Sequence, residues 1–202
     1  VDTALLGNRE RDLNNGYSPL KLGKGSANYL HDPVFLSRLG SNPSSNDSDV
    51  IGKIVDVIFN PSLTCDDLRT IKNHTKLPVL LKGILHEEDA RKALHYGVDG
   101  VIVSNHGGRQ LDGCISSFEA LPSIAEVIQG VVPILLDSGI RRGSDVIKAR
   151  ALGANAVLLG RPFVYGLAVA GENGVRHVLN DFINDIDVSL ALTGFSSLQQ
   201  VN

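Results

Sequence analysis

Side chains suited to acid–base chemistry and to anion binding follow short apolar runs of the sequence. The most informative run, residues 100–103, leads directly into the segment 104–109, SNHGGR. This segment combines a titratable imidazole, two glycines that let the backbone turn tightly, and a planar guanidinium suited to a carboxylate. In parallel α/β proteins the functional residues gather at the carboxyl ends of the strands. His106 and Arg109 are therefore the first candidates for a proton-accepting base and an anion-binding residue.

Charged residues also follow three further apolar runs. Lys82 comes after Val79-Leu80-Leu81, a place where a buried ammonium group needs an anionic partner. Two later runs are each followed by glycine and arginine just before an expected helix: Asp137, Ser138, Gly139, Ile140, Arg141, Gly160 and Arg161. Such residues beside a helix N-terminus bind anions, and the loops after the last two strands of barrel enzymes commonly hold a phosphate. The sequence therefore predicts a site for a phosphate-bearing cofactor.

The elements that position these residues follow from the apolar pattern. Strands are expected at 79–82, 100–104, 134–137 and 156–160, and helices at 86–96, 116–129, 144–152 and, broken near 171 and 174, at 162–192. The strand runs are continuous rather than alternating, which is typical of parallel strands buried on both faces. The class is therefore α/β.

An internal repeat refines the fold prediction. The segment 78–84 is echoed by 133–140, and 97–101 is echoed by 153–157 at nearly the same offset. Repeated βα units are typical of a (β/α)8 barrel, although a doubly wound open sheet is an alternative. Because a barrel usually needs about 250 residues, four strands in 202 residues predict roughly half a barrel. Residues 77–202 hold the four βα units, after a loop-rich lead-in at 1–76.

Only two features are expected within this lead-in. A short helix is predicted at 66–73, and the polar run at 40–48 is expected to be a surface loop or an active-site lid.

Composition excludes several classes of function. A net charge of -3, from 19 basic and 22 acidic residues, argues against nucleic acid, and the lack of a long apolar run argues against a membrane partner. Cys65 and Cys114 have no CxxC spacing and no secretory signal is seen, so free thiols and a cytoplasmic location are expected. The histidines lack metal-ligand spacing, so no metal site is predicted. The sequence contains no methionine, even at position 1, so we expect that an upstream segment was removed or not recorded.

The segment 104–112 resembles the signature of the FMN-dependent 2-hydroxy-acid oxidoreductases, which include glycolate oxidase, lactate oxidase and mandelate dehydrogenase. The resemblance extends over essentially the whole chain, through 78–84, 137–143 and 160–162, and the segments 27–29, 32–35 and 61–64 are most similar to lactate 2-monooxygenase members. It implies a flavoprotein of the TIM-barrel class with FMN as cofactor. The implied partners are an L-2-hydroxy acid, lactate being the first choice, and oxygen, with a tetramer or octamer for the intact protein.

The resemblance also implies a role for each candidate residue. His106 would accept a proton from the 2-hydroxy acid, with Asp2 pairing to the imidazole, and Arg109 and Arg9 would bind the substrate carboxylate. Lys82 would offset negative charge on the flavin ring, and Ser104 would form a hydrogen bond with the flavin. The remaining cofactor-binding residues would be Asp137, Ser138, Gly139, Ile140, Arg141, Gly160 and Arg161.

Members of this family carry an N-terminal half that supplies the first barrel strands and part of the flavin pocket, so this chain corresponds to the C-terminal half. The leading hypothesis is oxidation of an L-2-hydroxy acid to the keto acid or its decarboxylated product. A catalytically inactive half-barrel that serves only as an assembly or structural module is one alternative. Another phosphate-binding barrel, an isomerase or synthase, is a second one. The sequence leaves open which acid is used and whether the outcome is that of an oxidase or a monooxygenase.

Overall fold

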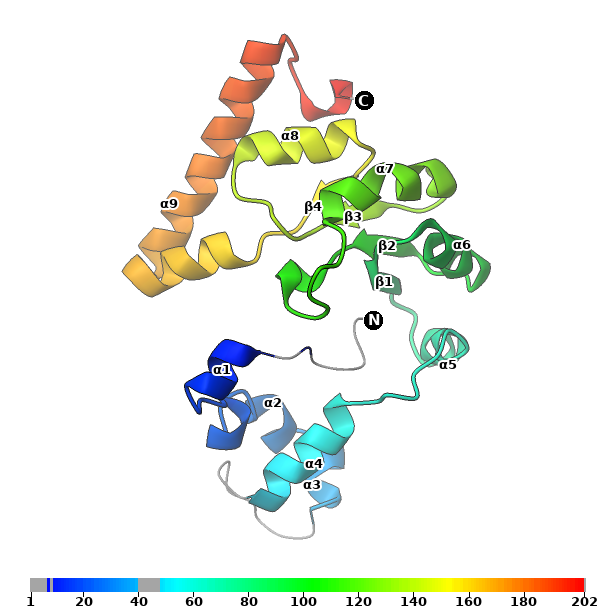
Figure 1. Cartoon of the computed structure of the whole chain (residues 1–202), viewed down its shortest axis with the longest axis vertical. Helices are drawn as coiled ribbons and strands as arrows, with labels where there is room; N and C mark the ends of the chain where they lie inside the picture. Colours follow the sequence, from blue (N-terminus) through cyan, green and yellow to red (C-terminus); the bar gives the residue numbers. More distant parts are fainter. Residues whose placement is uncertain (1–6, 8, 40–47, 202) are drawn as a thin grey trace. The chain divides into compact units, whose positions relative to one another are not determined.

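The computed structural model describes residue 7 and residues 9–39 and 48–201, with only the backbone of Ser48. The chain forms two compact units, a smaller one that ends at Leu63 and a larger one that begins at Thr64 (Figure 1). Each unit has a hydrophobic core of its own.

The smaller unit is helical rather than loop-rich. Its elements are α1 (Glu10–Asn14), the 3-10 turn η1 (Leu20–Leu22), α2 (Ala27–Leu30), α3 (Pro33–Ser37) and α4 (Ser48–Ile58). Val50 and Ile54, one helical turn apart on α4, are buried with Phe35 of α3. The prediction of a loop-rich lead-in therefore missed these helices, which are too short to show a clear period. The proposed lid at 40–48 lies outside the described residues except for the start of α4.

The larger unit is built on a parallel four-stranded sheet. Its strands are β1 (Leu80–Ile84), β2 (Gly100–Val103), β3 (Ile134–Leu136) and β4 (Ala156–Val157), and they lie side by side in chain order. A doubly wound sheet reverses its strand order at a switch point, whereas consecutive parallel strands are the arrangement of a barrel arc. The predicted class and the four strands are confirmed. Only β4 is clearly shorter than expected.

Helices alternate with these strands close to the predicted positions. They are α5 (Asp67–Asn73), α6 (Glu87–His95), α7 (Ser117–Ile128), α8 (Gly143–Ala151) and α9 (Arg161–Thr193), with 3-10 turns η2 (His106–Gly108) and η3 (Leu198–Gln200). The break predicted near Gly171 is present as a kink at Ala170 and Gly171. Gly174 does not interrupt the helix. It packs so closely against the Gly166 backbone that a Cβ atom would not fit.

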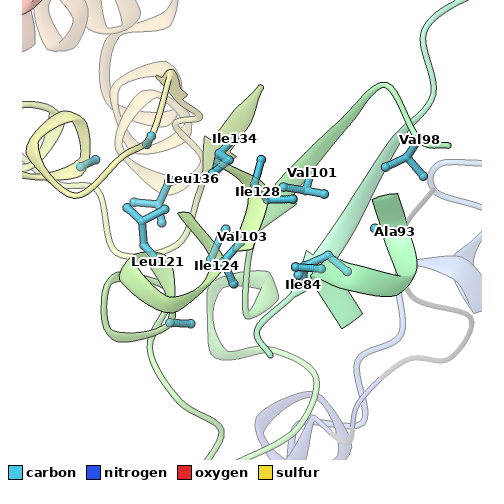
Figure 2. Packing of buried hydrophobic residues seen from close by; sticks show 14 of the residues in the cluster. Ile84, Ala93, Val98, Val101, Val103, Leu121, Ile124, Ile128, Ile134 and Leu136 are labelled. Carbon is cyan, nitrogen blue, oxygen red and sulfur yellow. The ribbon is translucent and has the colours of Figure 1, made fainter. Parts of the chain in front are cut away.

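The core lies between one face of the sheet and the crossover helices. Figure 2 shows buried side chains of α7, among them Leu121 and Ile124, in one cluster with Val103 and Leu136 from the strands. Right-handed crossovers between consecutive parallel strands place all their helices on the same face. The opposite face, which carries Ile102 and its neighbours in register, is only partly buried among the described residues. Burial on both faces therefore stays a prediction for the intact barrel.

The sequence repeat corresponds to a repeated hydrogen-bond pattern. The Asp99 carboxylate accepts the N–H of Val79 at 2.8 Å, and the Asp99 N–H donates to the Val79 carbonyl at 2.9 Å. Asn155 makes the same two bonds with Ile134, at 2.8 and 2.7 Å. The Val79 N–H, followed by Lys72, holds the pKa of the Asp99 carboxyl below its usual range. Each pair fixes the start of one strand against the start of the next.

A β-bulge at the end of β1 sets the direction of two side chains. Lys82 pairs with Ile102 of β2, and the next residue of β2, Val103, pairs with Ile84. Gly83, with a φ of 98°, is therefore the extra residue of the bulge. Ile84 consequently joins the core, whereas Lys82 stays on the open face of the sheet with Ile102. The bulge thus turns Ile84 into the core, just after the Lys82 ammonium group on the open face.

Candidate active site

A cavity of about 600 Å³ lies at the carboxyl ends of the strands, within the larger unit. This volume is in the usual range for a small-molecule or cofactor site, about 300 to 1,000 Å³. Its walls include one residue of β1 and residues that follow β2, β3 and β4: Lys82, His106, Gly107, Arg109, Asp137, Ser138, Gly139, Ile140, Arg141, Leu158, Leu159, Gly160, Arg161, Pro162 and Tyr165. The topology therefore brings together side chains that are up to 83 residues apart in the chain.

His106 has a backbone conformation that is rare for a residue with a side chain. Its φ is 57°, in the left-handed region, and Gly107 follows at 66°. Two side chains stabilise this turn, since the His106 N–H donates to Ser104 Oγ at 3.0 Å and the Gly108 N–H to Asn105 Oδ1 at 3.0 Å. Ser104 itself is almost fully buried. Such a locally supported, strained turn at a cavity is typical of a functional residue.

Lys82 connects the imidazole to a carboxylate. Its Nζ atom lies 3.3 Å from His106 Nδ1 and 3.5 Å from Asp137 Oδ2. The side chains of Lys82 and Asp137 are each 19% exposed, so their charges are less screened than those of a surface pair. The sequence prediction that Lys82 needs an anionic partner is confirmed.

The N–H and the carbonyl of Gly107 each form a hydrogen bond with a residue that follows a later strand. Its N–H donates to Ser138 Oγ at 2.8 Å, and its carbonyl accepts from Arg161 Nη2 at 3.1 Å. A side chain at Gly107 would lie 3.1 Å from the Arg161 guanidinium as well as straining the backbone. Residues after β3 and β4 therefore fix the loop that carries His106.

The remaining cavity wall combines cationic and apolar side chains. Arg109, Arg141 and Arg161 are exposed guanidinium groups on the wall, and Arg161 begins helix α9. Apolar surface comes from Ile140, Leu158, Leu159 and the ring of Tyr165. A helix N-terminus beside arginines favours a phosphate, and the apolar wall suits a planar ring. The donor set thus fits a cofactor that combines both parts.

Not every predicted site residue lies on this cavity. Ser104 lies beneath the His106 turn, Arg9 belongs to the smaller unit, and Asp2 lies outside the described residues. The roles of Arg9 and Asp2 therefore remain predictions. Tyr165 was missed, although its position one turn after Arg161 on an expected helix was a usable signal.

No metal centre emerges from the part of the chain that the structure describes, since no group of three or more His, Cys, Asp or Glu side chains is placed to bind an ion. Within the same part, the helices fall short of the length and apolarity that crossing a bilayer requires. Cys65 and Cys114 are free thiols.

Together, the fold and the cavity define an α/β protein with the strand order of a barrel and a cofactor-type site at the carboxyl ends of its strands. The family model described as FMN-dependent dehydrogenase matches residues 1–202. The chain is 51% identical to an L-lactate oxidase of Lysinibacillus sphaericus over 199 residues, 98% of this chain and 51% of the relative. A 2-hydroxyacid oxidase of Dictyostelium discoideum is 45% identical, over 100% of this chain and 49% of the relative. The chain belongs to the FMN-dependent dehydrogenase family.

Solved structures agree with this family membership. A mandelate oxidase crystallised with (S)-2-phenylpropionate matches with a TM-score of 0.77 and 38% identity, over 100% of this chain and 51% of that structure. Mandelate oxidase is a (β/α)8-barrel enzyme, and FMN is the cofactor of the family, as predicted. The chain spans about half the length of the curated relatives it matches.

Proposed function

We propose that the protein of which this chain forms the catalytic half oxidises an L-2-hydroxy acid, first of all L-lactate, with FMN as cofactor and oxygen as electron acceptor. The observation that carries this proposal is the grouping of His106, Lys82 and Asp137 in one cavity that three arginines also line. Two relatives named L-lactate oxidase, at 51% and 45% identity, support lactate and oxygen. When bound, FMN would supply the acceptor for the two electrons and for the hydrogen of the hydroxyl-bearing carbon, and the hydroxyl proton goes to a base of the protein.

His106 is the base that accepts the hydroxyl proton of the substrate. The proton goes to the ring nitrogen that carries no hydrogen in the neutral imidazole, and Nδ1 of this ring lies 3.3 Å from the Lys82 ammonium. The carboxylate of Asp137 lies 3.5 Å from the same ammonium and offsets its charge, so an imidazolium can form beside it. The turn around His106 orients the ring toward the cavity before any ligand arrives.

Arg109 binds the carboxylate of the 2-hydroxy acid. It follows His106 by three residues, lines the same cavity, and is exposed there. A guanidinium forms two parallel hydrogen bonds with a carboxylate, which fixes the substrate in one orientation. The substrate hydroxyl can then face the imidazole.

The other lining residues hold the cofactor. Arg141 and Arg161, with the amide groups at the start of α9, are the phosphate-binding groups, and Gly160 leaves room for the phosphate. Lys82 supplies positive charge for the flavin ring, and Ser104 accepts the His106 N–H. The backbone from Asp137 to Arg141 lines the cavity, so Gly139 and Ile140 would contact the cofactor through main-chain atoms.

Several finer assignments stand as proposals alone. They are the release of hydrogen peroxide rather than a decarboxylated product, the homo-oligomeric state, the similarity to lactate 2-monooxygenases, and a cytoplasmic location. The free thiols of Cys65 and Cys114 support the last of these.

The test compares two proteins under anaerobic conditions. One is the 202-residue chain, and the other is a chimera in which this chain replaces the matching half of the Lysinibacillus sphaericus L-lactate oxidase. Each is titrated with FMN, and the visible flavin band is followed after addition of L-lactate. We expect bleaching in the chimera, its loss in His106→Ala with FMN still bound, and a raised lactate requirement in Arg109→Lys.

Substitution of one arginine inside the cavity and one outside it supplies the matched comparison for FMN binding. Arg161→Ala should weaken FMN binding, whereas Arg91→Ala, an exposed arginine paired with Glu87 on helix α6, should not. Normal bleaching in the His106→Ala chimera would refute the assignment of the base. FMN binding and bleaching by the 202-residue chain itself would rule out the inactive-module alternative for this chain.

A further inference from the structure

We propose that Ser138 is a positioning residue that transmits the charge of the Asp137–Lys82 pair to the loop carrying His106. This inference rests on the proposed function, because it concerns how the proton-accepting imidazole is held. It assigns Ser138 a role through its hydroxyl group rather than direct contact with the cofactor. The contacts of that hydroxyl carry the inference.

The hydroxyl of Ser138 bridges two loops. It donates to Asp137 Oδ1 at 2.7 Å and accepts the N–H of Gly107 at 2.8 Å. Asp137 Oδ2 faces Lys82 Nζ at 3.5 Å, and the same ammonium lies 3.3 Å from His106 Nδ1. These contacts form a closed ring that passes from the imidazole through lysine, aspartate, serine and the Gly107 amide back to the backbone of His106.

The donor capacity of Ser138 is used up within this ring. A serine hydroxyl has one proton, and in Ser138 it is donated to Asp137. A short hydrogen bond to a carboxylate polarises the hydroxyl and makes its oxygen a better acceptor for the Gly107 N–H. The carboxylate charge therefore strengthens the bond that fixes the peptide following His106.

The backbone of Ser138 gives an independent reason to look for a role of its side chain. Its φ is 74°, in the left-handed region, where glycine is the unstrained residue. Backbone geometry alone would be satisfied better by glycine, so the hydroxyl has to compensate for the strain. The two hydrogen bonds of Ser138 are the interactions that do so.

Two substitutions separate the hydroxyl from the backbone conformation. Ser138→Gly removes the hydroxyl and relieves the φ strain, whereas Ser138→Ala removes the hydroxyl and keeps the strain. If the hydroxyl positions the loop, the Gly107 amide exchanges faster in both variants. If only the backbone conformation matters, Gly107 amide exchange in Ser138→Gly is the same as in the unaltered protein. Ser123→Ala is the matched control, since that hydroxyl donates to a helix carbonyl of α7 at 3.1 Å.

The first measurement is amide hydrogen exchange of Gly107 in the cofactor-free 202-residue chain. A net hydrogen bond of about 1 kcal/mol corresponds to roughly five-fold slower exchange, so we expect exchange about five-fold faster in both Ser138 variants. The Gly108 amide is the internal reference, because its acceptors are the Asn105 side chain and carbonyl. This readout needs neither FMN nor activity, so it stands even if the proposed function fails.

The second measurement uses the chimera with L-lactate oxidase. We expect Ser138→Gly to slow flavin reduction at saturating lactate about five-fold or more while the apparent KM for lactate changes less than two-fold. The ¹⁵N resonances of the His106 ring should shift in the same variant.

Three results would overturn the inference. They are fast Gly107 exchange in the unaltered chain, unchanged Gly107 exchange in Ser138→Gly, and loss of FMN affinity alone without a slower reduction step. The unaltered chain already tests the hydrogen bond if a variant fails to fold.

Discussion

At the scale of single residues, the site depends on backbone conformations that most side chains avoid. His106 and Ser138 both have positive φ angles; the His106 N–H donates to Ser104 two residues earlier, and the Ser138 hydroxyl accepts the Gly107 N–H from the preceding loop. Their residue types and their positions after the strands were predictable from the sequence. The bond between Gly107 and Ser138 was not predictable, because it joins residues 31 apart in the chain whose geometry depends on the whole sheet.

The Asp99 and Asn155 pairs lead to a prediction about pH. The folded-state pKa of Asp99 is lowered first by the Val79 N–H and then by Lys72, so its charged form contributes stability above the unfolded carboxyl pKa of about 4. This contribution is lost as the pH falls through the lower folded pKa. In Asp99→Asn the amide keeps an acceptor for Val79, as Asn155 does for Ile134, but does not titrate.

We therefore expect the stability advantage of the unaltered chain over Asp99→Asn to be present at pH 7 and to shrink on acidification below about pH 4. Urea unfolding midpoints of both proteins between pH 7 and pH 2.5 measure this. A constant difference across that range would contradict the assignment of the low pKa to Asp99. The stability advantage of the unaltered chain at pH 7 should also be smaller in 1 M salt, because Lys72 and Asp99 are partly exposed.

At the scale of elements, the predicted strands and helices were mostly right because the apolar runs and their capping residues are local signals. Ser116 and Glu119 form a capping box at the start of α7, within the range expected for that helix. Two features were not local. The bulge at Gly83 and the shortness of β4 depend on pairing with neighbouring strands, which a single sequence does not reveal.

The contact between α8 and α9 makes a prediction at this scale. A Cβ atom on Gly143 would lie 2.5 Å from Ile186 N and 2.6 Å from the Phe182 carbonyl, so helix α9 has to move away. Overpacking of this kind costs about 1–3 kcal/mol. We therefore expect Gly143→Ala to lower the free energy of unfolding of the larger unit by about 1 kcal/mol or more. Since Arg161 is carried at the start of α9, FMN affinity should fall as well.

Thermal or urea unfolding of Gly143→Ala checks this expectation. Gly52→Ala is the control, because Gly52 lies inside α4 with nothing within 4 Å of the added Cβ, and alanine is favoured over glycine in a helix by about 1 kcal/mol. The two substitutions should act in opposite directions. A stabilised Gly143→Ala would mean that the two helices are less closely packed than the structure shows.

At the scale of the whole molecule, the sequence predicted half of a barrel, and the chain does match about half of the length of its relatives. The division into two units was less predictable. Apolar periodicity identifies a sheet and its crossover helices, but the short helices of the smaller unit gain their stability from packing against one another.

The two units have separate cores, and this leads to a prediction about cooperativity. Ile54 is fully buried with Phe35 and Val50, whereas Val103 is fully buried in the core of the larger unit. Truncating a buried isoleucine to alanine costs about 2–5 kcal/mol. Because the cores share no residue, Ile54→Ala should raise the hydrogen exchange of α4 amides and leave the amides of β2 protected. Val103→Ala should give the reverse pattern, and equal loss of protection in both units for either variant would show that they unfold as one.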